Sequence, residues 1–413
     1  MDLGLNYNRP LVMHIDLNSC FATIEQQANP LLRHKPVAVA AYDTPRGIIL
    51  AASYEAKALG IKLGVTVKEA RMICPEIIVM MPDPDKYFDA HRRFEQVLCK
   101  YTNEVTPKSV DEFVVDFTGS IAIRSGISME EIGRQIKQDI RAFLGEYVSV
   151  NVGIGPNRFL AKLAAGLHKP DGMDKIDASN LRRIYSGLEL IDLPGINYRY
   201  AARLNLAGIY SPLQMLDAPL MQLKREVFHS IVGFYWYLRL RGHEVDTVDF
   251  GRKSFGQQYA ISQKTTDKHE LSRLLMKLCE KAGRRLRKQG YQAGGIYLWL
   301  AYEDRTYWAK RQQLRTAVYS TQDIFRQAQS LLMATPENTA RATNIGVSIH
   351  NLQLVNPLQL GLFDDTRLDT RSLAVAADQV NDRYGEFTLV PALMANMQDI
   401  IIKRVSFGQD STN

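Results

Sequence analysis

Apolar and polar residues alternate with two different periods along the first 176 residues. Short apolar runs predict strands, and the first run, 11–17, carries the carboxylate of Asp16 near its end. Further strands are predicted at 36–41, 47–52, 109–117 and 148–154, and helical spacing predicts helices at 54–59, 88–101, 129–144 and 157–167. Helices and strands that alternate in this way predict an α+β layer around a sheet.

The pattern changes twice in the rest of the chain. Residues 177–243 have helical and turn-rich spacing with little strand signal, and they include a predicted helix at 198–206. From Ser254 the α+β pattern returns, with helices at 268–289 and 321–334, strands at 295–302 and 342–352, and a weakly amphipathic helix at 373–384. A chain of 413 residues is long enough for roughly two to four domains.

Composition is that of a soluble globular protein, with 46% apolar and 23% charged residues. The chain lacks a run of ~18 apolar residues, and its polar start does not resemble a signal peptide, so we expect no membrane segment. Four scattered cysteines suit a reducing compartment, and we expect a cytoplasmic location.

Positive charge is concentrated in one segment. Residues 252–315 contain 15 Lys and Arg against 5 Asp and Glu, whereas the net charge of the whole chain is +7. This excess fits a solvated charged face or a surface that contacts nucleic acid. The count alone does not distinguish the two interpretations.

Three carboxylates on two predicted strands are the strongest chemical signal. Asp16 lies on the first strand, and Asp111 and Glu112 are adjacent on the strand at 109–117. Transfer of a nucleotidyl group uses two divalent cations about 3.5–4 Å apart, and such a pair needs a cluster of carboxylates. Adjacent acids can also simply straddle a strand, with one side chain facing in and one facing out. The pair by itself leaves both interpretations open.

The order of motifs resembles that of the Y-family of translesion DNA polymerases, the DinB/UmuC type. Asp16-Leu17-Asn18-Ser19-Cys20-Phe21 is similar to the first metal-binding segment of that family, and Ser109-Val110-Asp111-Glu112 is similar to the second. The two segments are about 95 residues apart, as in the family, and the resemblance extends from Leu11 to Phe363.

The resemblance implies a low-fidelity, DNA-directed DNA polymerase that uses two Mg²⁺ ions, with Mn²⁺ able to replace them. Asp16 and Asp111 would bridge both ions, Glu112 would bind the catalytic ion, and the backbone carbonyl of Leu17 would bind the ion on the nucleotide side. Phe21 would be the steric gate beneath the sugar that excludes ribonucleotides. Taken alone, Phe21 would be interpreted as a core residue.

Several residues would bind the triphosphate if the resemblance holds. The backbone amides of Ser19, Cys20 and Phe21 would surround it. Tyr54 and Lys57 share one face of a helix start, where the family commonly has Tyr and Arg; lysine keeps the charge but lacks the bidentate fork of arginine. Lys169, in a Lys-Pro-Asp-Gly string that would otherwise indicate only a turn, matches a late phosphate-contacting lysine.

Two further segments would bind DNA. Leu193-Pro194-Gly195-Ile196 before a helix resembles a helix-hairpin-helix, in which the amides around Gly195 contact phosphate without reading sequence. The predicted helix at 268–289 would give salt-dependent affinity for the DNA backbone. Its cations are Lys277, Lys281, Arg284, Arg285, Arg287 and Lys288.

A short motif near the end predicts a protein partner. Gln359, Leu360, Gly361, Leu362 and Phe363 resemble the peptide that binds the bacterial sliding clamp, and the alternative is a tail folded back on its own domain. The remaining expected partners are primer–template DNA and dNTP, and we expect a monomer.

The whole chain is therefore expected to form a right-hand polymerase. The palm is predicted at 1–25 and 81–176, small fingers at 26–80, a helical thumb at 177–245, a linker at 246–251, a little finger at 252–355 and a clamp-binding tail at 356–413. Two other classes remain as alternatives: a polymerase-like protein that binds clamp and DNA without catalysis, and a sequence-specific DNA-binding module. The intact acids argue against the first, and the lack of a recognition-helix or zinc pattern argues against the second.

Overall fold

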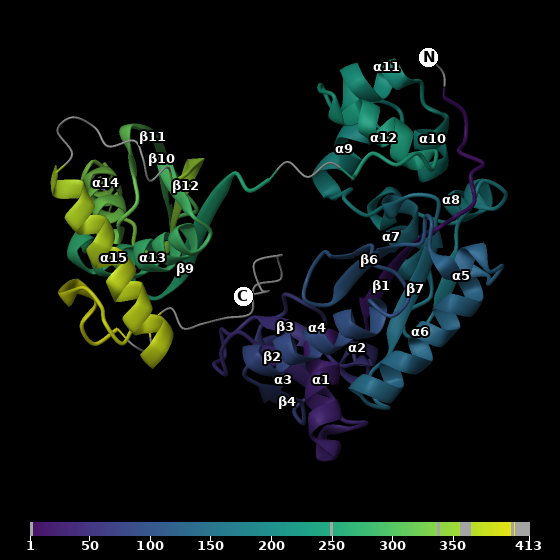
Figure 1. Cartoon of the computed structure of the whole chain (residues 1–413), viewed down its shortest axis with the longest axis horizontal. Coiled ribbons are helices and arrows are strands. Elements are labelled where there is room, and N and C mark those ends of the chain that lie inside the picture. The colour runs from purple at the N-terminus through teal and green to yellow at the C-terminus, as the bar shows by residue number, and fades with distance from the viewer. Residues whose placement is uncertain (1–2, 248–250, 337–338, 356–364, 398–399, 401–413) are drawn as a thin grey trace. The chain divides into compact units, whose positions relative to one another are not determined.

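The computed structural model describes residues 3–247, 251–336, 339–355, 365–397 and 400. These residues form two compact units, divided between residues 248 and 249 (Figure 1). None of the described helices combines the length and the apolar character that crossing a membrane requires.

A five-stranded sheet is the centre of unit 1. Its strand order is β5-β6-β1-β7-β8, and β1 pairs antiparallel with both β6 and β7. The strands are β1 (Val12–Leu17), β5 (Val105–Pro107), β6 (Glu112–Asp116), β7 (Val150–Gly155) and β8 (Met173–Lys175).

The two faces of this sheet have different neighbours. Met13, Ile15 and Leu17 of β1 belong to a large apolar core that also includes α4 (Pro84–Leu98) and α6 (Met129–Leu144). Because side chains alternate along a strand, His14 and Asp16 lie on the opposite face, where α7 (Arg158–Leu167) packs against β1 and β7. The catalytic candidates therefore lie on the α7 face of the sheet.

A smaller, three-stranded sheet lies between α1 and α4 in sequence. Its order is β3-β2-β4, and its core is formed mainly by small residues such as Ala38, Ala52 and Ala56. The elements of this region are α1 (Cys20–Ala28), β2 (Val37–Ala40), β3 (Ile49–Ala52), α2 (Tyr54–Ala58), α3 (Val67–Ile73) and β4 (Ile78–Met80), with a 3₁₀ turn at Pro30–Leu32. Small side chains and short elements give this layer little depth.

The rest of unit 1 is helical. Its core packs around Tyr185, Leu204 and Trp236, which are all buried. The elements are α8 (Leu181–Ser186), α9 (Tyr198–Leu206), α10 (Pro212–Asp217), α11 (Leu220–Gln222) and α12 (Val232–Leu240), with a 3₁₀ turn at Leu190–Asp192 and a π turn at Leu223–Val227. The short helix α5 (Ile121–Arg124) precedes α6 and packs against the core of the five-stranded sheet.

Unit 2 consists of a four-stranded antiparallel sheet and three long helices. The order is β11-β10-β12-β9, and one core joins the sheet to α13 and α14. The elements are β9 (Ser254–Thr265), α13 (Lys268–Lys288), β10 (Tyr291–Tyr302), β11 (Tyr307–Val318), α14 (Thr321–Met333), β12 (Ala342–Leu354) and α15 (Asp365–Tyr384), with a 3₁₀ turn at Ala392–Met394.

Candidate active site

The strand register brings two of the three predicted acids together. Asp16 on β1 lies directly opposite Glu112 on β6, so both side chains are on the same face of the sheet. Asp111 precedes β6; its carbonyl accepts a 2.9 Å hydrogen bond from the Leu17 amide, and its carboxylate accepts one of 2.6 Å from Ser109 Oγ. A backbone hydrogen bond thus joins the two segments that contain the predicted metal ligands, and a side-chain bond holds the Asp111 carboxylate within its own segment.

The two adjacent acids have opposite pKa shifts. Burial raises the pKa of Asp111, and the nearby charges of Asp16 and Glu112 raise it further, although the Ser109 hydrogen bond opposes them. Burial also acts to raise the pKa of Glu112, but His14 and Lys162 outweigh it and lower the value to about 2. Glu112 is therefore held ionised, and the Asp111 carboxylate is costly unless a cation accompanies it.

His14 and Lys162 were not predicted from the sequence as site residues. Lys162 Nζ is 2.6 Å from Glu112 Oε2, and His14 Nε2 is 3.7 Å from the same oxygen. His14 is 2% exposed, and neither of its ring nitrogens has a hydrogen-bond partner among the described residues. The sequence did contain one indication for His14: side chains alternate along a strand, so residues 14 and 16 of β1 lie on the same face.

Two glycines allow α7 to lie directly on the sheet. A Cβ at Gly153 would be 2.0 Å from the carbonyl oxygen of Ala161, and one at Gly155 would be 2.5 Å from its amide nitrogen. Both contacts are with the backbone of α7, so a side chain at either position would push the helix away. This close approach brings Lys162, the next residue of α7, to Glu112.

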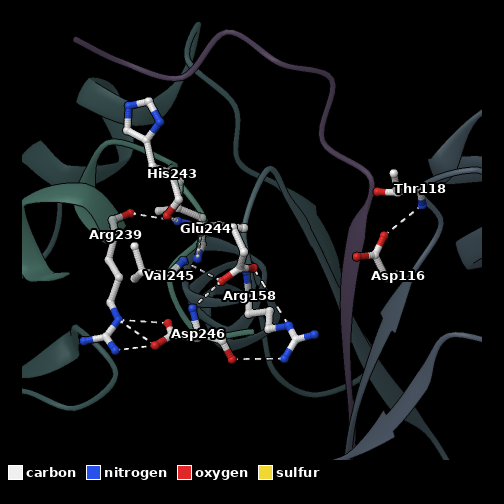
Figure 2. Close-up of polar contacts among 10 residues, drawn as sticks. Asp116, Thr118, Arg158, Arg239, His243, Glu244, Val245 and Asp246 are labelled. Carbon is white, nitrogen blue, oxygen red and sulfur yellow. Dashed lines mark hydrogen bonds and ion pairs between the residues drawn. The ribbon is translucent and has the colours of Figure 1, made fainter. Parts of the chain in front are cut away.

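The start of α7 is held by the segment that follows α12 (Figure 2). Glu244 Oε2 accepts the backbone N–H of Arg158 at 2.9 Å, and Asn157 Nδ2 donates to the carbonyls of Arg239 and His243. Asp246 pairs with the Arg239 guanidinium, and its carbonyl accepts a bond from Arg158. The helix that carries Lys162 is therefore fixed at its start as well as along its length.

The predicted triphosphate residues form a cluster of cations beside the acids. Lys57 Nζ donates to Ser19 Oγ at 2.6 Å and lies 4.6 Å from the centre of the Tyr54 ring. Lys169 Nζ is 2.6 Å from Asp16 Oδ2. Burial, followed by the charge of Lys169, lowers the pKa of Lys57. The two lysines, which are 112 residues apart in sequence, are close enough to affect each other.

Phe21 and Cys20 begin helix α1, immediately after the acid of β1. Phe21 is 1% exposed, and its ring stacks on Tyr87 at 4.4 Å between centroids. Cys20 is also buried, and burial, with the charges of Asp111 and Asp16, raises the pKa of its thiol. Phe21 is therefore a well-packed residue near the acids, and its role as a steric gate stays a prediction.

The predicted DNA contacts differ in their surroundings. Gly195 has a φ of +95° in the turn before α9, a conformation that favours glycine. On α13, Lys288 is exposed, and Lys281 and Arg285 are half-buried. These four residues remain candidates for DNA contact.

Lys277 and Arg284 of α13 require a correction, because the C-terminal segment covers them. Lys277 is 1% exposed, and its amine donates to the carbonyl of Met397 and lies 4.7 Å from the Phe387 ring. Arg284 is 15% exposed and pairs with Asp382 at 2.8 Å. These two cations bind the protein's own chain, which argues against their predicted contact with DNA.

Arg287 belongs to the same internal network. Its guanidinium forms two hydrogen bonds with the carboxylate of Asp378 on α15, at 2.6 and 2.8 Å. Its side chain is 4% exposed. The predicted clamp residues, Gln359, Leu360, Leu362 and Phe363, lie outside the described residues.

Comparison with known proteins agrees with this geometry. Residues 15–166 match the model of the impB/mucB/samB family, and residues 252–362 match its C-terminal domain. DNA polymerase IV of Pelotomaculum thermopropionicum is 31% identical over 398 residues, covering 95% of this chain and 97% of that protein. DNA polymerase IV of Moorella thermoacetica is 32% identical over 383 residues, covering 91% and 94%.

Solved structures show the same similarity. A Y-family DNA polymerase chimera, Dbh-Dpo4(243-245)-Dbh, has a TM-score of 0.72 at 25% identity, covering 84% of this chain and all of the chimera. A sheet with clustered acids, joined to a helical region and a second α+β unit, is the architecture of a Y-family polymerase. The chain belongs to the impB/mucB/samB family of Y-family DNA polymerases and is of the DinB type.

Proposed function

We infer that this chain is a DNA-directed DNA polymerase that performs translesion synthesis, adding deoxynucleotides to a primer opposite damaged template bases. The observation that carries the inference is the pairing of Asp16 with Glu112 across β1 and β6, with Asp111 beside them, in a member of this family. Asp16 and Glu112 side by side, with Asp111 near enough to be affected by their charges, suit nucleotidyl transfer from dNTP to a primer 3′-hydroxyl.

The acids fit a pair of divalent cations, for which we propose Mg²⁺, with Mn²⁺ as a substitute. Carboxylate atoms of Asp16 and Glu112 lie, with a ring nitrogen of His14, within 4.8 Å of one another, and Asp111 is half-buried near them. Asp16 and Asp111 would bind both ions, Glu112 the catalytic ion, and the Leu17 carbonyl the other. When bound, the ions activate the 3′-hydroxyl and neutralise the triphosphate.

The protein's own groups would then orient the nucleotide. Lys57 and Lys169 supply two ammonium groups beside the acids, and Tyr54 lies under Lys57. Backbone amides at Ser19 to Phe21, at the start of α1, would bind phosphate oxygens. The Lys169 ammonium group is paired with the Asp16 carboxylate. A bound triphosphate would be a second anion for this ammonium group to neutralise.

The sugar would be selected by Phe21. Its ring is fixed by stacking on Tyr87, whose hydroxyl donates to Glu25 at 2.8 Å. A buried ring that is stacked on a fixed neighbour has little room to move aside for a 2′-hydroxyl, and rejection by such a clash needs rigidity. We therefore propose that Phe21 excludes ribonucleotides.

The domain assignment is proposed as palm 1–25 and 81–176, fingers 26–80, thumb 177–245, linker 246–251 and little finger 252–355, with a tail at 356–413. The three-stranded sheet with its small side chains would form shallow fingers that check base-pair shape poorly, which suits damaged templates. DNA phosphates would contact the amides around Gly195 and the exposed Lys288, and Gln359 to Phe363 would bind a sliding clamp.

A single-nucleotide primer-extension assay tests the proposal. Asp111→Asn, which removes a charge at constant size, should reduce nucleotide addition by about 10³-fold, as expected when a group that stabilises transition-state charge is lost. Affinity for primer–template, measured by fluorescence anisotropy, should change little.

Asp116→Asn is the matched control. Asp116 ends β6, the strand that Asp111 precedes, and its carboxylate accepts the Thr118 amide (Figure 2). It should extend primers like the wild type. Equal extension by both variants would show that Asp111 is not catalytic. A wild-type chain that binds primer–template without extending it would instead support a non-catalytic binding protein.

A further inference from the structure

The short helix α2 carries two of the proposed triphosphate ligands, Tyr54 and Lys57. It has only five residues, and helices of this length are not stable by themselves, because too few hydrogen bonds repay the cost of ordering the first turn. The positions of these two ligands therefore depend on the contacts that hold α2 to the rest of unit 1.

The ligand side of α2 contacts the start of α1, where the phosphates would bind. Lys57 Nζ donates to Ser19 Oγ at 2.6 Å, and the Tyr54 hydroxyl is 3.5 Å from Asn18 Oδ1. The Lys57 ammonium group is exposed and would turn to phosphate when a nucleotide binds. These contacts change during the reaction, so α2 needs a second support that does not.

Glu55, which follows Tyr54 in α2, provides such a support. One of its carboxylate oxygens accepts the Tyr147 hydroxyl at 2.8 Å, and the other accepts the Gln26 amide at 3.1 Å. Burial acts to raise the pKa of Glu55, but hydrogen bonds, among them those from Ser53, Gln26 and Tyr147, outweigh it and lower the pKa. Glu55 is therefore an ionised carboxylate with a hydrogen bond to each oxygen.

Tyr147 belongs to the turn between α6 and β7, and this turn is itself fixed. The Tyr147 amide donates to Gln27 Oε1 at 2.9 Å, and the Arg33 guanidinium lies 5.5 Å from the centre of the Tyr147 ring. A Cβ at Gly145, in the same turn, would lie 2.2 Å from the Gln27 side chain, so the turn packs directly on α1. The Tyr147 hydroxyl is thus held beside Glu55.

We propose that Tyr147 is a positioning residue for the triphosphate: through Glu55 it holds α2 so that Tyr54 and Lys57 face the start of α1. The inference rests on the proposed polymerase function, because the triphosphate is that of the incoming dNTP. Tyr147 would touch neither the nucleotide nor the metal ions. It would link the proposed palm, which carries the acids, to the proposed fingers, which carry Tyr54 and Lys57.

The palm contains a second hydrogen-bonded group of the same composition, which provides a matched control. Asp139 on α6 accepts the Tyr101 hydroxyl at 2.8 Å and the Gln135 amide at 3.1 Å, and Tyr101 and Tyr147 are both half-buried. Helix α6 packs on the face of the five-stranded sheet opposite the acids. Tyr101→Phe and Tyr147→Phe therefore remove the same kind of bond, but only Tyr147→Phe removes it from α2.

Steady-state extension by one nucleotide, at increasing dNTP concentration, tests the proposal in the full-length chain. Tyr147→Phe should raise KM about 10-fold, the factor for losing a hydrogen bond to a charged group at the weak end of its range. It should keep the wild-type kcat, because nucleotide binding is weakened and not the chemical step. Inorganic triphosphate, which has no base or sugar, should inhibit this variant about 10-fold more weakly. Tyr101→Phe should match the wild type in all three values.

Glu55→Leu shows whether Tyr147 acts through Glu55 or through the His34 amide, which also donates to the Tyr147 hydroxyl, at 3.1 Å. In a Glu55→Leu background, Tyr147→Phe should raise KM no further, since the bond between the two side chains is already lost. An additional increase there, equal KM values for Tyr147→Phe and Tyr101→Phe, or a lower kcat at unchanged KM would overturn the proposal. Extension by the wild-type chain is scored in the same assay, so failure here is distinct from failure of the polymerase assignment.

Discussion

Replacing Gly153 by alanine perturbs the active centre through the packing of one helix. The added Cβ would lie 2.0 Å from the Ala161 carbonyl oxygen and 2.2 Å from the Ala165 amide nitrogen. Real Cβ atoms stay at least 3.0 Å from such atoms, so α7 would have to move back by about 1 Å or more. Lys162 on that helix would then lose its 2.6 Å contact with Glu112.

Two effects should follow from this displacement. Overpacking a core costs about 1–3 kcal/mol, which for a domain the size of unit 1 lowers the thermal midpoint by about 2–12 °C. Misplacing groups beside the reacting atoms by about 1 Å can reduce turnover by about 100-fold. The variant should therefore be only moderately less stable but much less active at a temperature where it is folded.

Gly166→Ala provides the comparison, since it makes the same change in α7 itself, where a Cβ would have no heavy atom within 4 Å. It should be neutral or stabilising by up to about 1 kcal/mol, because alanine favours helix. Differential scanning calorimetry and single-turnover extension are the two measurements. If Gly153→Ala matched Gly166→Ala in both, the packing of α7 on β7 would not be what positions Lys162.

Three further outcomes are expected. Phe21→Ala should incorporate rNTP as well as dNTP in a competition assay, and an unchanged sugar preference would place the gate elsewhere. Lys277→Ala should lower the melting temperature of unit 2 but leave the salt dependence of DNA affinity unchanged, because its amine bonds Met397; a smaller salt slope would contradict this. Changing Leu362 and Phe363 to Ala should abolish stimulation by a loaded sliding clamp while leaving distributive extension intact, and calorimetry showing equal clamp affinity would refute the motif.

Much of the fold was predictable because its elements have clear periods and caps. The predicted helices at 129–144 and 198–206 coincide with α6 and α9, each of which begins after a residue that caps its N-terminus. Strand β11 was missed. It is an edge strand whose polar side chains, among them Lys310 and Gln313, are exposed on both faces, so it has no apolar period. Only its pairing with β10 makes it a strand.

The three acids were predicted to be catalytic because the order of motifs along the chain resembled the family, not because of the residue pattern around each acid. Asp111 and Glu112 are adjacent in sequence, and alternation alone would have placed them on opposite faces of one strand. In the structure the register with β1 places Glu112 on the same face as Asp16, and the Asp111 carbonyl bonds the Leu17 amide at the end of that pairing. Lys162 could not be assigned, because its contact with Glu112 depends on how closely two glycines of β7 let α7 approach.

The basic helix α13 shows why charge counts are ambiguous. A run of cations along a helix makes the local electrostatic potential positive only where acids from other elements do not neutralise those cations. Here Asp378 and Asp382 of α15, together with Glu386 just after that helix, pair with Arg284 and Arg287. These acids are about 100 residues away from the arginines in sequence. Lys264 on β9 of the same unit pairs in a similar way with Glu303, in the turn between β10 and β11. Attraction for a polyanion therefore depends less on the number of cations than on which of them lack an internal carboxylate.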